Sequence, residues 1–273
     1  MASIASETPR KTMSPRRKAQ ISRWVQYAVL VAVIVFLAVI ADWKLLGTQF
    51  LNKDIIPQLF PDLITIALKN TILYTLGAFV FGLALGLVLA LMRLSPVAPY
   101  RWIATAFIEF FRGVPALIVF IAFQYGLPTA FGFLLPGGIV GTVTVALGLV
   151  GAAYMAETIR AGIQAVPKGQ MEAARSLGMS STRAMISVII PQALRIVLPP
   201  LTNELILLTK DSSLVYVLGL GVTTVELTAF GRQGLNQFVN LTPLFAAAIA
   251  YLVITIPLSI VVRRMEARSE RAR

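Results

Sequence analysis

Many polar side chains lie between residues 201 and 213, and seven of them are candidates for contact with a polar solute. They are Thr202, Asn203, Glu204, Thr209, Lys210, Asp211 and Ser213. On a helical wheel, Leu201, Leu205 and Leu208 form one narrow apolar arc, and the polar residues occupy most of the rest. Hydroxyl, amide and charged groups in this arrangement can bind a polar solute, which predicts a lining or gating role. Alternatively, Lys210 and Asp211 lie at the outer end of a helix and only fix its orientation.

Charges in this stretch are costly, because the composition is that of a membrane protein. Hydrophobic residues make up 57% of the 273 residues and charged residues only 13%, about half the share that is usual in soluble domains. An isolated charge at the centre of a membrane helix costs roughly 2.5–3.5 kcal/mol, so Glu204, Lys210 and Asp211 need partners or water. Pro199 and Pro200 favour the same interpretation, because an interrupted backbone is tolerated where it borders protein or a water-filled path.

The chain has no histidine and no cysteine, which removes several kinds of chemistry. Disulfides, thiolate nucleophiles and imidazole or thiolate metal sites are excluded, so we expect no catalytic residue and no metal ligand. The sequence also lacks a glycine-rich phosphate-binding loop with Lys and Ser or Thr, so we expect no enzyme activity and no cofactor bound by this chain. The net charge of +12 fits basic cytoplasmic loops better than nucleic-acid binding.

Long uncharged intervals predict an all-α, polytopic membrane protein. There are 18 uncharged residues between Arg23 and Asp42, and 44 between Arg112 and Glu157. The longer interval must fold back on itself, with its turn in the Gly/Pro-rich residues 126–138. The six expected crossings are residues 24–43, 64–92, 108–128, 139–157, 198–220 and 243–262. Gln124, Glu157 and Glu226 fall near predicted helix ends, where we expect ordinary interfacial solvation.

The distribution of Lys and Arg places both chain ends in the cytoplasm, which an even number of crossings satisfies. The expected organisation is a basic cytoplasmic tail (1–23), an additional N-terminal transmembrane helix (24–43), a core (63–262) with a cytoplasmic loop (160–195), and a second basic tail (263–273). A secretory signal peptide is the alternative for the N-terminal segment. The uncharged run is longer than usual for such a peptide, and Trp24 and Trp43 flank it as interfacial residues do.

The cytoplasmic loop has helical patterning that a simple spacer does not need. Pro167 can open a helix in which Met171, Ala174, Leu177 and Gly178 share one face, and Glu172, Arg175 and Ser176 share the other. Gly178 can stop this helix, Ser180 or Ser181 can cap a second one, and Pro191 can end that one. The resulting elbow either rests on the lipid surface or docks into a cytoplasmic partner.

Glu109 and Arg112 lie three residues apart, so on a helix they face the same way and can form an ion pair. Gly113 and Pro115 follow directly and interrupt helical structure. The simpler interpretation is a structural pair that positions this break, and the alternative is direct contact with a solute.

Several blocks of this sequence resemble the permeases of ABC importers. Glu172-Ala173-Ala174, Gly178 and Val188-Ile189-Ile190-Pro191 stand at the spacing of the EAA loop of that family, with Val188 for Ile and Ile190 for Leu. Four further blocks are similar to the polar amino acid branch, whose members take up histidine, glutamine, glutamate or arginine. They are residues 111–115, 154–163, 166–170 and 210–214. The resemblance covers roughly residues 63–265. The helix at 24–43 is additional to the commonest five-helix pattern of that branch.

The resemblance implies a type I importer permease in the inner membrane of a prokaryote. Its ATPase-coupling residues would be Glu172, Ala173, Ala174, Gly178 and Pro191. The implied partners are ABC ATPase subunits that bind ATP and magnesium, a second permease subunit (the same or a sister chain) and an extracytoplasmic substrate-binding protein, besides membrane lipid and without nucleic acid. A stand-alone secondary transporter or channel for small polar solutes is the alternative. Neither the amino acid transported nor the identity of the second subunit follows from the sequence.

Overall fold

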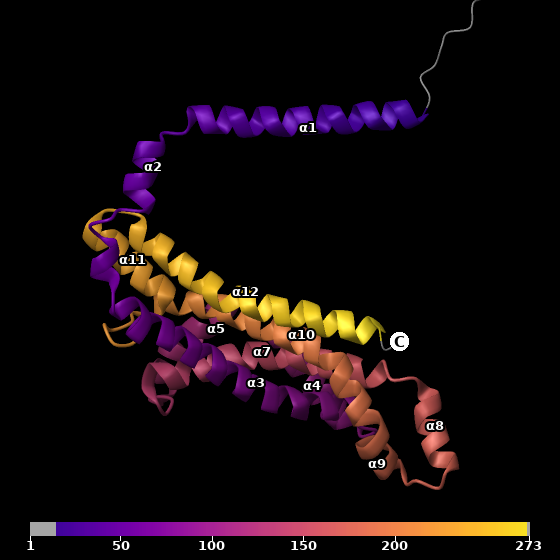
Figure 1. Cartoon of the computed structure of the whole chain (residues 1–273). Helices are drawn as coiled ribbons and strands as arrows, with labels where there is room; N and C mark the ends of the chain where they lie inside the picture. The colour runs from indigo at the N-terminus through magenta and orange to yellow at the C-terminus, as the bar shows by residue number, and fades with distance from the viewer. Residues whose placement is uncertain (1–14, 272–273) are drawn as a thin grey trace, which may run out of the picture. The chain divides into compact units, whose positions relative to one another are not determined.

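The computed structural model describes residues 15–271, so residues 1–14 and 272–273 of the two expected basic tails lie outside the described residues. The chain divides into two compact units, Met1–Gln49 and Phe50–Arg273. All regular secondary structure within residues 15–271 is helical (Figure 1), as the sequence predicts.

The first unit contains a long apolar helix, α1 (Pro15–Ile40), and most of a short one, α2 (Trp43–Phe50). Helix α1 is long and apolar enough to cross a membrane, and it includes four basic residues that the sequence places in a tail, Arg16, Arg17, Lys18 and Arg23. It ends three residues earlier than expected. The Asp42 carboxylate accepts a hydrogen bond from the Leu45 amide (2.9 Å) and starts α2. The Trp43 indole also donates to the Ala38 carbonyl (2.8 Å) across the break.

Two long helices, α3 (Lys69–Leu94) and α7 (Gly138–Gln164), form the centre of the second unit. Small residues let their backbones approach closely. A Cβ atom at Gly82 would lie 2.9 Å from the Gly148 carbonyl oxygen, and one at Gly86 would lie 3.0 Å from that of Ala152. Close backbone approach through small residues is a common way to pack membrane helices, because no hydrophobic driving force between helices exists in lipid.

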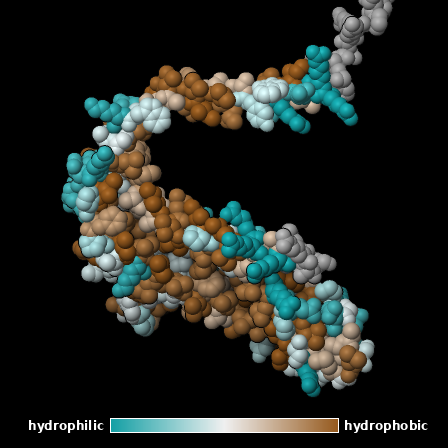
Figure 2. Space-filling model, viewed as in Figure 1, coloured by the Kyte–Doolittle hydropathy of each residue, from teal (hydrophilic) through white to brown (hydrophobic). Residues whose placement is uncertain are grey.

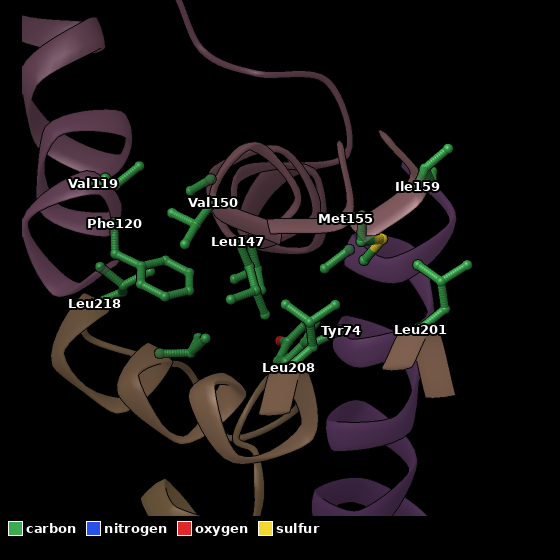
Figure 3. Close-up of a cluster of buried hydrophobic side chains, with 14 of the residues drawn as sticks. Tyr74, Val119, Phe120, Leu147, Val150, Met155, Ile159, Leu201, Leu208 and Leu218 are labelled. Atoms are coloured by element: carbon green, nitrogen blue, oxygen red, sulfur yellow. The ribbon is translucent and has the colours of Figure 1, made fainter. Parts of the chain in front are cut away.

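The largest hydrophobic cluster surrounds α7 (Figure 3). Phe120 of α5 (Ala116–Ile121) and Leu218 of η5 (Ser212–Leu218) lie on one side of Leu147. Tyr74 of α3 and Leu201 of α10 (Ile190–Asp211) lie on the other side. Helix α7 is therefore the central helix, and α3, α5, α10 and η5 pack against it.

The third expected crossing is bent. Helix α4 (Ala98–Gly113) and the stretch from α5 through η3 (Ala122–Gly126) to α6 (Leu127–Phe131) meet at 103°. The first arm of this crossing begins ten residues before the expected 108–128, and the break falls at Gly113–Pro115, where the sequence predicts it. Pro115 has no amide hydrogen to continue the helical bonding, which explains the interruption. Within the described residues, five helices are long and apolar enough to span a membrane, or up to six if the bent pair is one span.

The fifth crossing is also longer than predicted. A helical run from Ser181 to Leu218 joins α9 (Ser181–Ala184), the π-helical η4 (Met185–Ile189), α10 and η5. The sequence predicts that Pro191 ends a helix, and this prediction is wrong. Pro191 instead occupies the first turn of α10, where a missing amide hydrogen costs nothing. Pro199 and Pro200 lie inside α10 rather than at its beginning.

The remaining elements complete the outer half and the last crossing. They are η1 (Ile56–Leu59), η2 (Leu63–Leu68), α11 (Leu227–Phe238) and α12 (Thr242–Arg271). Helix α12 packs against α10 and α11 and continues beyond the predicted end at residue 262. In Figure 2 the flank of this bundle is largely hydrophobic and hydrophilic residues gather towards its ends, as expected for a body that crosses a bilayer.

Side chains of α3 hold the loop that precedes α11. The Asn70 amide nitrogen donates to the carbonyls of Thr223 and Val225, both at 2.9 Å. The Tyr74 hydroxyl donates to the Thr224 carbonyl at 2.7 Å. Because these bonds satisfy three backbone acceptors, the loop is tied to the central helix pair.

Candidate functional site

A cavity of about 440 Å³ lies where the α4–α5 break meets α7 and α10. Its lining residues come from three elements. They are Arg112 to Ala116 at the break, Val150 and Tyr154 on α7, and Glu204, Leu207, Leu208 and Asp211 on α10. The helix break therefore forms part of the cavity wall, which has both polar and apolar residues inside a membrane-spanning bundle.

The structure divides the predicted polar set of residues 202–213. Glu204 and Asp211 line the cavity, because residues seven apart on a helix share a face. Thr209 is buried away from it and donates to the Leu205 carbonyl (2.8 Å). Thr202 likewise donates to the backbone one turn earlier, and Asn203, Lys210 and Ser213 do not line the cavity. Spacing alone could not have separated the two carboxylates from the others, because Thr202 and Thr209, and Asn203 and Lys210, are also seven residues apart.

Arg112 lines the same cavity as the α10 residues, but without the partner that the sequence predicts. Within residues 16–268, no salt bridge joins it to Glu109. Its guanidinium carbon instead lies 5.6 Å from the ring centre of Tyr154, a cation–π distance. Gly113 and Pro115 form the break as expected, and a Cβ atom at Gly113 would meet nothing within 4 Å.

Glu157 takes part in an ion cluster that the sequence interpretation missed. Its carboxylate accepts from Arg160 Nε (3.1 Å) and Nη2 (2.6 Å), and Arg93 Nη2 lies 3.4 Å from its other oxygen. Arg93 also donates to the Thr105 hydroxyl. The prediction of ordinary interfacial solvation is therefore wrong for Glu157, which links α7 to α3 through Arg93, and Arg93 in turn contacts α4. The i,i+3 spacing of Glu157 and Arg160 was a usable signal.

Glu226 is also no interfacial residue, since its side chain is fully buried. It caps α11 by accepting from the amides of Thr228 (2.6 Å) and Ala229 (2.7 Å), and it accepts from the Tyr251 hydroxyl (2.9 Å). It lies between the last two membrane-spanning segments. Burial raises the pKa of Glu226 to about 7, and these hydrogen bonds act in the opposite direction.

The cytoplasmic elbow begins with α8 (Lys168–Ser176), directly after Pro167. Gly178 has a φ of +82° and its amide donates to the Arg175 carbonyl (3.0 Å), so it stops the helix as predicted. Ser180 then caps α9 by accepting from the Arg183 amide (3.3 Å). The elbow therefore consists of two capped helices joined by a glycine that a side chain would strain.

Side chains of α8 are divided between the bundle and solvent. Ala174 is buried, and Met171 packs on the cluster formed by Val166, Ile189 and Ala193. Glu172 and Ala173 are exposed. Leu177, which the sequence assigns to the same face as Ala174, is 84% exposed, because the helix ends before it. The tip of the elbow thus presents an apolar side chain to solvent.

A polytopic bundle with a charged cavity and an exposed cytoplasmic elbow has the architecture of an importer permease. Residues 82–271 match the family described as the binding-protein-dependent transport system inner membrane component, and the chain belongs to that family. Within it, the similarity is to permeases for amino acids. The chain is 42% identical over 203 residues to the probable glutamine ABC transporter permease protein GlnM of Bacillus subtilis (strain 168), covering 74% of this chain and 91% of the relative.

Two further proteins that are similar to this chain also belong to amino acid transporters. The arginine transport system permease protein ArtQ of Bacillus subtilis (strain 168) is 38% identical over 187 residues, which cover 68% of this chain and 83% of the relative. A crystal structure of an amino acid ABC transporter with histidines has a chain with a TM-score of 0.69 and 36% identity, covering 78% of this chain and 96% of that one.

The chain is thus a permease subunit of an ABC importer for polar amino acids, and a multi-pass protein of the bacterial inner membrane. The resemblance, the fold class and the transport function predicted from the sequence are confirmed. As a component of an ABC transporter complex it has ATPase and binding-protein partners, and the ATPase activity belongs to a partner.

Proposed function

We propose that this permease moves its substrate through the cavity at the α4–α5 break and receives the energy of ATP hydrolysis through α8. The observation that carries the proposal is that the two expected sites are separate and differently built. The cavity is lined by charges of both signs inside the bundle, whereas the elbow is exposed at the cytoplasmic end.

The cavity suits the part that all amino acids share. Arg112 on one wall can bind the α-carboxylate, and Glu204 or Asp211 on the other can bind the α-ammonium group. Leu207, Leu208 and Val150 supply apolar surface between them. The names of the relatives differ in the amino acid they carry, so the similarity leaves the side chain of the substrate open.

The elbow suits a docking role better than a lipid-resting one. Helix α8 already uses Met171 and Ala174 to pack on the bundle, so no continuous apolar face remains to lie on lipid. Its exposed residues are Glu172, a small Ala173 that permits close approach, and the apolar Leu177. These residues are the contact with an ATPase subunit, which binds ATP and magnesium. Pro191, in the first turn of α10, begins the helix that leads from the elbow into the bundle.

The remaining parts of the proposed assembly follow the same arrangement. A second permease subunit, identical or a sister chain, completes the pathway. The binding protein delivers the amino acid at the opposite, outer end. Helix α1 forms an additional membrane-spanning segment.

A pull-down of the tagged chain from native membranes in mild detergent tests the coupling role. Wild type is expected to recover an ABC ATPase, identified by mass spectrometry, and Gly178→Arg is expected to lose it. Gly132→Arg is a matched control, because Gly132 also has a positive φ (+62°) and open space around it but lies outside the cytoplasmic loop. Glu172→Arg changes an exposed charge without backbone strain and should also weaken recovery.

Two results would contradict the proposal. Undiminished ATPase recovery and uptake with Gly178→Arg would show that the elbow is not the contact. Wild-type chain that returns repeatedly alone or only with itself would favour a stand-alone transporter.

A further inference from the structure

We propose that the cavity at the α4–α5 break selects amino acids with a positively charged side chain, such as arginine or lysine. This inference rests on the proposed function, because it concerns the side chain of the solute that passes through the same cavity. It is carried by the number, sign and spacing of the charges on the cavity walls.

The charges that line the cavity do not cancel. Arg112 is the one basic residue of the lining, whereas Glu204 and Asp211 are two acidic ones. None of the three forms a salt bridge in residues 16–268, where both ion pairs are made by Glu157. Lys210, although next to Asp211 in sequence, is exposed and does not line the cavity. The walls therefore hold one more acidic group than basic groups, and no salt bridge in the described part of the chain pairs any of the three.

The two carboxylates are spaced for two cationic groups rather than one. Glu204 and Asp211 stand seven residues apart, which is two turns of α10 and roughly 10 Å along its axis. Leu207 and Leu208 lie between them on the same face and give an apolar surface for a methylene chain. A basic amino acid has an α-ammonium group and a second cationic group at the far end of such a chain. Each group can therefore pair with its own carboxylate.

Charge balance separates the three classes of amino acid. A basic amino acid brings two positive groups and one carboxylate, so that with Arg112 every charge in the cavity is paired. A neutral amino acid leaves one wall carboxylate unpaired in a site of low dielectric, which is unfavourable. An acidic amino acid adds a second carboxylate, so four negative groups face two positive ones, the Arg112 guanidinium and the α-ammonium group. The order of affinity expected from the walls is basic, then neutral, then acidic.

Equilibrium binding of radiolabelled L-arginine, L-glutamine and L-glutamate to the permease–ATPase complex in nanodiscs, without the binding protein, tests this order. Wild type is expected to bind arginine at least tenfold more tightly than glutamine, and glutamate most weakly. Asp211→Asn removes one of the two acidic groups and should reduce the preference for arginine over glutamine about tenfold. Glu204→Gln combined with Asp211→Asn makes the cavity net positive and should favour glutamate over arginine. Glu266→Gln, an exposed carboxylate on α12, is the matched control and should leave the order unchanged.

Three results would overturn the inference: equal or tighter binding of glutamate to wild type, an unchanged preference in both carboxylate variants, or no binding of any of the three amino acids. The wild-type order is informative by itself if a variant does not fold. Failure here is distinguishable from failure of the proposed function, because recovery of the ATPase in the pull-down does not depend on which amino acid binds.

Discussion

Neutralising Glu226 should change how the stability of the protein depends on pH. The carboxylate is fully buried and accepts three hydrogen bonds, from the amides of Thr228 and Ala229 and from the Tyr251 hydroxyl. Burial raises its pKa from 4.5 to about 7. Glu226→Gln keeps the size and one acceptor oxygen of the side chain, and removes its ionisation.

The size and sign of the effect follow from the difference in pKa. Because the folded protein holds the proton of Glu226 more tightly than the unfolded chain does, this group stabilises the fold most below pH 4.5. That contribution is lost as the pH rises towards and through 7. A pKa that moves from 4.5 to about 7 corresponds to about 3 kcal/mol of unfolding free energy between these limits. Loss of one amide hydrogen bond in Glu226→Gln costs roughly 1 kcal/mol, but equally at both pH values.

Thermal unfolding in an uncharged detergent, followed by tryptophan fluorescence at pH 5 and pH 8, measures this difference. Wild type should lose more stability than Glu226→Gln between the two pH values, and the exposed Glu266→Gln should behave like wild type. Other titrating groups contribute to both proteins and cancel in the comparison. Equal losses in wild type and Glu226→Gln would refute the assigned role of burial.

Three further predictions concern the bundle. Gly82→Ala should lower the unfolding free energy by about 1–3 kcal/mol, because a Cβ atom there meets the Gly148 carbonyl oxygen at 2.9 Å. Gly113→Ala should not lower it, because a Cβ atom there meets nothing within 4 Å. Thermal unfolding of the two variants measures the difference. Asn70→Ala removes two hydrogen bonds and should speed hydrogen exchange in residues 219–226, measured by mass spectrometry. Deletion of residues 1–49 should leave ATPase recovery in the pull-down intact, because the second unit has its own core.

The sequence predicts the membrane-spanning helices well, because charges are costly inside a bilayer and each crossing therefore leaves a long interval with few or no charged residues. The uncharged intervals locate α3, α7 and α12 within a few residues at their outer ends. The 103° bend at Gly113–Pro115 is not predictable in the same way, since Pro and Gly show where a helix can break but not the angle that packing imposes. Helix ends that continue into the cytoplasm, as in α12, are likewise missed, because basic residues outside the bilayer do not oppose helix formation.

The site was predicted in its composition more than in its arrangement. Glu204, Asp211 and Arg112 were all singled out from the sequence, but their meeting at one cavity depends on the bend of α4 against α5, which is a tertiary property. Glu226 was misjudged because a buried carboxylate and a solvated one look alike in sequence. Its three donors come partly from α12, 25 residues away along the chain. Local spacing carries no information about such a partner.

The helical run Ser181–Leu218 links the elbow to the cavity and predicts how they are coupled. From Ser181 to Glu204 it is about 35 Å long at 1.5 Å per residue, so a displacement of the elbow reaches the cavity wall if the helix stays stiff. Leu194→Gly with Arg195→Gly, at two exposed positions of α10, should soften this connection, whereas the same positions changed to Ala should not. In proteoliposomes of the full complex, the Gly variant should hydrolyse ATP but import less amino acid per ATP than the Ala variant. If the two variants import the same amount of amino acid per ATP, the elbow acts on the cavity through another element. Helix α7 is the candidate, because it precedes the elbow in the chain and also lines the cavity.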